Sequence, residues 1–128
     1  MTGRFARASL VALLATLGFT VPAPASAATA AATSCYGGAV TVHYGDAIDF
    51  GPYRTTSRCV DINMRVTGGT SDFVKACVKF ATTGVCNRWT RVDRSWTTVA
   101  TDVLDGSRFT VLIGVPLEGD SATVQIAF

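Results

Sequence analysis

The strongest constraint on the fold of this chain is an alternation of apolar and polar residues that recurs along its length. Every second residue is apolar over residues 40–44, 60–66, 74–80, 109–115 and 122–128. Successive side chains of a β-strand point to opposite faces, so this period indicates strands with one buried face. After residue 27, no segment repeats apolar residues at the helical spacing over three turns. The pattern therefore predicts an all-β fold.

Turn-forming residues between these segments predict how the strands connect. The glycines of residues 67–71 predict a hairpin between the strands at 60–66 and 74–80. The dipeptide Asp105-Gly106 predicts another hairpin, between residues 97–103 and the apolar stripe that follows. Six or seven short strands of this kind favour a small antiparallel β-sandwich. Their spacing resembles that of immunoglobulin-like and fibronectin-like modules, without the Cys-Trp-Cys signature of true immunoglobulin domains.

Four cysteines add a second constraint. The intervals between Cys35, Cys59, Cys77 and Cys86 contain no C-x2-C or C-x4-C clamp, which disfavours zinc ligation and thiol redox chemistry. Of the three possible pairings, we expect Cys35 with Cys59 and Cys77 with Cys86, because each bridge then closes a local loop. The loss of chain entropy in the unfolded state would stabilise the domain by about 3.5 kcal/mol for the first bridge and about 2.7 kcal/mol for the second.

The N-terminal segment has the pattern of an export signal. Arg4 and Arg7 precede an apolar stretch over residues 8–19 that is too short to span a bilayer comfortably, and Ala25-Ser26-Ala27 offers the small residues of a cleavage site. A secreted protein in an oxidising compartment would also account for paired cysteines. The expected organisation is a cleaved Sec-type signal peptide at residues 1–27, a flexible lead-in at 28–34 and a single β-sandwich domain at 35–128.

The charge balance argues against a polybasic binding surface. The chain has 11 basic and 9 acidic residues, and removal of Arg4 and Arg7 with the leader would leave nine of each. A formally neutral, exported domain is a poor candidate for nucleic-acid binding. No later segment is apolar enough to span a membrane. The leader and the Ala, Thr, Gly and Val content resemble those of small exported proteins of high-GC Gram-positive bacteria, a resemblance that assigns no site residue.

Groups suited to catalysis or to metal binding are few. His43 is the single histidine and lies on the polar side of its predicted strand, and no G-x-S-x-G motif is present. We therefore expect a non-enzymatic protein without a cofactor or a metal site. Two alternatives remain open on the acidic residues. A glycosidase-like acidic pair would have to come from Asp46, Asp49, Asp61, Asp102 and Asp105, and a weak calcium site from Asp46 and Asp49 or from Glu118 and Asp120.

The segment at residues 87–96 is the most distinctive after the expected signal peptide, because it combines three arginines with both tryptophans. Tryptophan offers a rigid flat surface to a sugar ring or a partner side chain, and a guanidinium donates hydrogen bonds in a fixed geometry. An alternative interpretation places both tryptophans at the edge of the core with arginine stems over them. The candidate binding residues are Arg88, Trp89, Arg91, Arg94 and Trp96.

These observations lead to two principal hypotheses of function. The first is a small secreted binding module that recognises a cell-envelope glycan or a secreted or surface protein. The second is an inhibitor of an extracellular protease or amylase, in which a disulfide-bonded scaffold holds an exposed loop ready for binding. The candidate inhibitory loops are residues 67–71, 81–84 and 116–121.

Overall fold

A computed structural model describes residues 18–22, 33–45 and 48–128 of the chain. Most of the expected signal peptide and lead-in lies outside these residues, so both stay predictions. None of the described helices combines the length and the hydropathy that a membrane span requires. The contacts divide the chain into two units, Met1–Ala30 and Ala31–Phe128. All strands of the described residues lie in the second unit.

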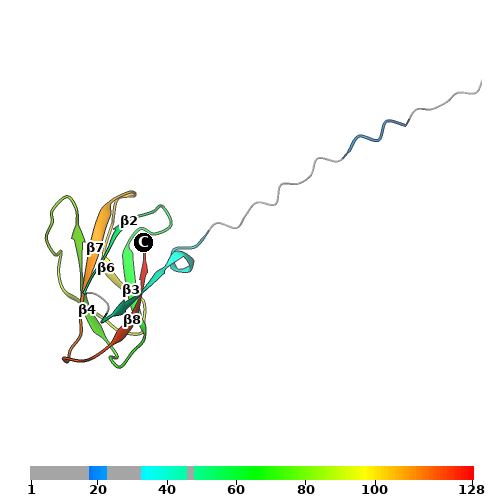
Figure 1. Ribbon diagram of the computed structural model, residues 1–128. Helices are drawn as coiled ribbons and strands as arrows, with labels where there is room; N and C mark the ends of the chain where they lie inside the picture. Colours follow the sequence, from blue (N-terminus) through cyan, green and yellow to red (C-terminus); the bar gives the residue numbers. More distant parts are fainter. Residues whose placement is uncertain (1–17, 23–32, 46–47) are drawn as a thin grey trace, which may run out of the picture. The chain divides into compact units, whose positions relative to one another are not determined.

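The second unit is built from two four-stranded antiparallel sheets (Figure 1). We call them the β1 sheet, with strand order β1-β8-β3-β6, and the β2 sheet, with strand order β2-β7-β4-β5. This confirms the predicted all-β sandwich, with eight strands in place of the six or seven expected. The elements are the 3-10 helix η1 (Tyr36–Gly38) and the strands β1 (Val40–Tyr44), β2 (Asp49–Arg54), β3 (Ile62–Gly68), β4 (Val74–Phe80), β5 (Thr90–Val92), β6 (Thr97–Ala100), β7 (Arg108–Gly114) and β8 (Ala122–Ala127).

The apolar stripes of the two sheets form one core between them. Val66 and Val124 from the β1 sheet, and Val78 and Val111 from the β2 sheet, are buried almost completely in the same cluster. The alternation is clearest in β7, where Phe109 and every second residue after it are buried while their neighbours are partly exposed. The opposite face of each sheet is therefore available for polar side chains.

The two hairpins predicted at residues 67–71 and at Asp105-Gly106 are wrong, whereas the turn at residues 81–84 does return the chain to β4, where Cys86 forms an antiparallel bridge with Lys79. β3 pairs with β6 and β8, whereas β4 pairs with β5 and β7, so the chain crosses from one sheet to the other between β3 and β4. The same holds for β6 and β7, which lie in different sheets. An alternating pattern specifies which face of a strand is buried, and two such strands can bury their stripes across the sandwich as well as side by side. Val60 also departs from the predicted stripe, because it precedes β3 and is 68% exposed.

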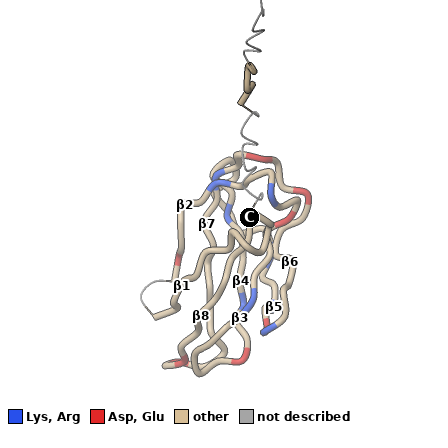
Figure 2. The backbone as a smooth tube through the Cα atoms, turned by 90° about the vertical axis from the view of Figure 1, so that its right-hand side faces the viewer, with Lys and Arg blue, Asp and Glu red and all other residues tan. Residues whose placement is uncertain are grey.

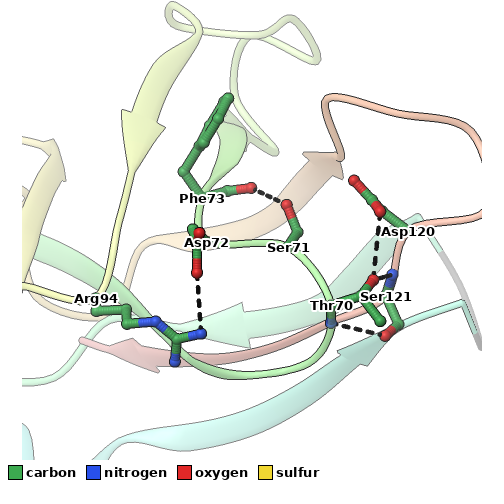
Figure 3. A network of polar contacts seen from close by, with 7 residues as sticks. All are labelled: Thr70, Ser71, Asp72, Phe73, Arg94, Asp120 and Ser121. Carbon is green, nitrogen blue, oxygen red and sulfur yellow. Dashed lines mark hydrogen bonds and ion pairs between the residues drawn. The ribbon is translucent and has the colours of Figure 1, made fainter.

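The crossing between β3 and β4 is held against the loop that precedes β8 (Figure 3). The Thr70 backbone N–H donates to Ser121 Oγ at 3.2 Å, and the Ser121 N–H donates to Thr70 Oγ1 at 2.9 Å. The Ser71 N–H donates to the Ser121 carbonyl at 3.0 Å. Gly69, with φ of 96°, lies so close that a Cβ there would be 2.6 Å from Ala122 Cα. We call these contacts, which join residues 69–71 to residues 120–122, the loop clamp.

Both disulfides have the predicted pairing. Cys35 is bonded to Cys59 with a Cα–Cα distance of 4.9 Å, and Cys77 is bonded to Cys86 with a Cα–Cα distance of 5.6 Å. Cys77 alternates with the inward residues of β4 and lies outside the core cluster although it is fully buried. The bridges therefore fasten the periphery of the sandwich, one at η1 and one at the turn between β4 and β5.

Aromatic rings close one end of the core. Phe109 meets Phe128 edge to face at a centroid distance of 5.2 Å, and Tyr53 lies 5.7 Å from Phe109 and 5.1 Å from Phe128. Burial raises the pKa of the Tyr53 phenol above its ordinary value, because a phenolate would lose its hydration there. Tyr53 therefore packs as a neutral, partly buried ring against the core.

We expect Gly69→Ala to destabilise the domain at least twice as much as Gly106→Ala. Both glycines have positive φ, which costs a residue with a Cβ about 1 kcal/mol or more. A Cβ at Gly106 meets open space, whereas a Cβ at Gly69 collides with the backbone of residues 121 and 122. Chemical denaturation of the two variants measures the difference. Equal losses of unfolding free energy would contradict the close approach of the two loops.

Candidate binding face

The five candidate binding residues do not form one site. The segment that contains them passes from one sheet to the other, and this separates the two tryptophans: Trp89 precedes β5 of the β2 sheet, while Trp96 precedes β6 of the β1 sheet. Trp89 is 53% exposed and Trp96 is half-buried. Neither tryptophan belongs to the core cluster.

Two of the candidate arginines hold the segment to the start of β4. The Arg91 guanidinium lies over the Phe73 ring at 3.5 Å from its centroid. Arg94 forms an ion pair with Asp72 at 3.3 Å, drawn in Figure 3, in which both side chains are largely exposed. Exposed ion pairs contribute little to stability. Both arginines therefore have partners within the domain, whereas Arg88 is exposed to solvent.

Trp96 lies at the centre of a cluster on the outer face of the β1 sheet. The Tyr36 ring stacks on it, with a centroid distance of 4.5 Å and an interplanar angle of 21°. The Arg65 guanidinium lies 4.7 Å from the centroid of the Trp96 ring. Arg65 Nε also donates to Gln125 Oε1 at 2.9 Å. We call the surface formed by Tyr36, Arg65, Trp96 and Gln125 the Trp96 face.

Strand register and one disulfide explain why these residues meet. Arg65 of β3 is directly opposite Gln125 of β8, and both occupy polar positions of their alternating strands. Tyr36 follows Cys35, whose bond to Cys59 ties η1 to the chain just before β3. The sequence singled out Trp96 alone of this group. Its partners were detectable only as polar positions of two predicted strands and as an aromatic residue beside a cysteine.

His43 extends the polar surface of the β1 sheet. It is exposed, as its place on the polar side of the strand predicted, and its Nδ1 lies 3.2 Å from Thr123 Oγ1 on the neighbouring strand. Its register partner Thr123 is two residues before Gln125. A general base needs a group that it can deprotonate and another that orients it, and the hydrogen bond of His43 runs to a single threonine hydroxyl.

Several of the acidic candidates have partners within the domain. Asp61 Oδ1 accepts the Asp102 backbone N–H at 2.9 Å, and Asp120 Oδ1 accepts the Thr70 hydroxyl at 3.3 Å. Asp49 forms an ion pair with Lys79 at 3.2 Å. Within the described part of the chain, no group of three or more His, Cys, Asp or Glu residues could hold a metal ion, and Asp46 lies outside that part.

A cavity of about 160 Å³ lies on the β2 sheet, away from the Trp96 face. Pro52, Lys79, Arg108 and Thr110 are among the residues that line it, and none of its lining residues, all of which the structure describes, is a carboxylate. An acidic pair of the glycosidase type would need two carboxylates facing one groove. The cavity does not provide that arrangement.

Charge is spread over the domain. Figure 2 shows Lys and Arg positions interspersed with Asp and Glu over the described residues, with no continuous basic stripe. The arrangement agrees with the nearly balanced charge of the sequence.

No known protein family, no curated protein and no solved structure matches the chain. The structure defines its class: a small β-sandwich with two disulfides and a cluster of aromatic rings and an arginine on an outer sheet face.

We expect Trp96→Ala to lower the free energy of unfolding by about 1–2 kcal/mol, through loss of the Tyr36 stack and the Arg65 contact. Trp89→Ala should change it by less than about 0.5 kcal/mol, because Trp89 is largely exposed. Urea denaturation followed by circular dichroism measures both. A larger loss for Trp89→Ala than for Trp96→Ala would contradict the described placement of the two rings.

Proposed function

We propose that the protein is a secreted, non-catalytic binding module that recognises its ligand through the Trp96 face. The observation that carries this proposal is the fixed arrangement of Tyr36, Trp96, Arg65 and Gln125, which are joined by a stack, a cation–π contact and a hydrogen bond on an outer sheet face. Side chains that are already ordered lose little conformational entropy when a ligand binds. The two disulfides agree with an extracellular location.

A glycan of the cell envelope or the extracellular medium is the ligand that this chemistry fits best. Aromatic rings pack against the apolar faces of sugar rings, while a guanidinium and an amide supply donors and an acceptor for hydroxyl groups. Tyr36 is 49% exposed, so part of its ring is available to a ligand.

Retention on insoluble polysaccharides tests the proposal. Wild-type protein should be retained on at least one polymer from a panel of peptidoglycan, chitin, cellulose and insoluble pectin, and Tyr36→Ala and Trp96→Ala should reduce the retained fraction several-fold. Trp89→Ala is the matched control, because it removes an exposed tryptophan from the other sheet and should leave retention unchanged.

Each variant is compared below its thermal midpoint, so that loss of folding does not imitate loss of binding. Absence of wild-type retention on every polymer would overturn the proposal. Loss of retention in Trp89→Ala, with Trp96→Ala unaffected, would overturn the assignment of the face.

One observation supports the second candidate function, inhibition of an extracellular hydrolase. The loop at residues 116–121 is fastened by the loop clamp at its C-terminal end, and it presents Leu117 with 68% of its surface exposed. The Asp120 N–H donates to the Leu117 carbonyl at 3.2 Å, which closes a turn at the tip. A fixed loop with an exposed apolar residue is suited to an enzyme's specificity pocket. Residues 69–71 of the candidate loop 67–71 form the other half of the loop clamp.

Incubation with a panel of secreted proteases and amylases tests this candidate. Inhibition at micromolar protein, reduced at least about tenfold by Leu117→Ala and unchanged by Leu104→Ala, would support it. Leu104 is the control because it is 80% exposed on a different loop. Full enzyme activity throughout the panel would remove the candidate.

A further inference from the structure

We infer that the ligand of the Trp96 face carries a carboxylate, so that the protein recognises an acidic glycan such as a polyuronate. The inference rests on the proposed function and narrows its ligand class. It comes from the unbalanced charge of one arginine, Arg65, and from the groups that hold this arginine in place.

Two basic side chains of the described residues are partly buried, Lys79 and Arg65, and the other seven are exposed. Lys79 has a counter-ion, because Asp49 lies 3.2 Å from its amine. Arg65 has none: no carboxylate of the described residues lies within 4.0 Å of its guanidinium. Partial loss of hydration disfavours a cation unless an anion or a set of acceptors compensates. The position of Arg65 therefore favours an anion supplied from outside.

The contacts of Arg65 orient its guanidinium without using its terminal nitrogens. Its hydrogen bond to Gln125 Oε1 is made by Nε, and its remaining contact of note is with the Trp96 ring. Among the described residues, neither terminal nitrogen of Arg65 has a hydrogen-bond partner in the protein. Two parallel N–H donors of this kind match the two oxygens of a carboxylate. Neither nitrogen is fully buried, so a ligand can reach both from solvent.

A second arginine without a carboxylate partner among the described residues lies beside η1, the 3-10 helix that begins with Tyr36. The Arg58 guanidinium packs against Gly38 of η1, where a Cβ would be 2.8 Å from Arg58 Nε. Arg58 is exposed, and no carboxylate of the described chain lies within 4.0 Å of it. Tyr36 begins the same 3-10 helix. An acidic sugar polymer with a ring on Tyr36 would therefore meet one guanidinium on β3 and another beside η1, whereas a neutral polymer has no carboxylate to pair with either.

The test compares two polymers that differ only in the carboxylate: polygalacturonate and the same polymer after reduction of its carboxyl groups. At fixed salt, wild-type protein should bind the acidic polymer at least about tenfold more tightly, the ratio expected for a hydrogen-bonded charge pair. Arg65→Gln should weaken binding of the acidic polymer far more than binding of the neutral polymer, and so remove most of this ratio. Arg65→Lys should restore only part of it, because an ammonium lacks the planar pair of donors.

Arg108→Gln is the matched control, because it removes an exposed arginine from the β2 sheet and should leave the ratio unchanged. Thermal midpoints establish that the variants are folded. If Arg65→Gln does not fold, the wild-type ratio and Arg65→Lys decide the question. A ratio near one, or a full ratio in a folded Arg65→Gln protein, would overturn the inference and leave the proposed glycan binding intact.

Two further outcomes distinguish failure of the proposed glycan binding from failure of the carboxylate inference. Failure to bind either form of the polymer, together with failure to bind every polymer of the earlier panel, would overturn the proposed function itself. Binding of poly-glutamate or of a poly(glycerol phosphate) as tightly as polygalacturonate would also overturn the inference, because the first has carboxylates without sugar rings and the second has phosphates in their place.

Discussion

The structure depends on the burial of two sets of apolar stripes against each other. Every strand long enough to alternate turns one face inward, and the core between the sheets is made almost entirely of aliphatic and aromatic side chains. The inward residues supply the buried apolar area that stabilises the fold. The outward positions of each strand are therefore not needed for the core. They are free to hold arginine, glutamine and histidine, and the candidate binding face is assembled from such positions.

The face of each strand could be predicted from the sequence, but its neighbours could not. The stripes at β1, β4, β7 and β8 agree with the alternation, and both disulfides agree with the preference for short loops. The predicted pairings of β3 with β4 and of β6 with β7 were wrong, because two apolar stripes bury nearly the same area whether they lie side by side in one sheet or face each other across the core. The sequence did not predict β2, because Gly51 and Pro52 interrupt its alternation. Its register with β7 also shifts between Phe50 and Tyr53.

The same limit explains why only part of the candidate site was found. Sequence reasoning grouped Trp89 with Trp96 because seven positions separate them, yet the chain changes sheets between β5 and β6. The residues that contact Trp96 come from η1, β3 and β8, and Arg65 meets Gln125 across a separation of 60 positions. Proximity of this kind follows from the order of strands in a sheet, which alternation does not encode.

The Cys35–Cys59 bridge connects the stability of the domain to its proposed function. η1 is a single 3-10 turn without a buried residue, so its own packing holds it weakly. The bridge joins the residue before Tyr36 to the segment that leads into β3, the strand that carries Arg65. One covalent bond therefore restricts the unfolded chain and also keeps an exposed aromatic ring stacked on Trp96. The bond thus links the proposed binding face to the disulfides, which agree with an extracellular location.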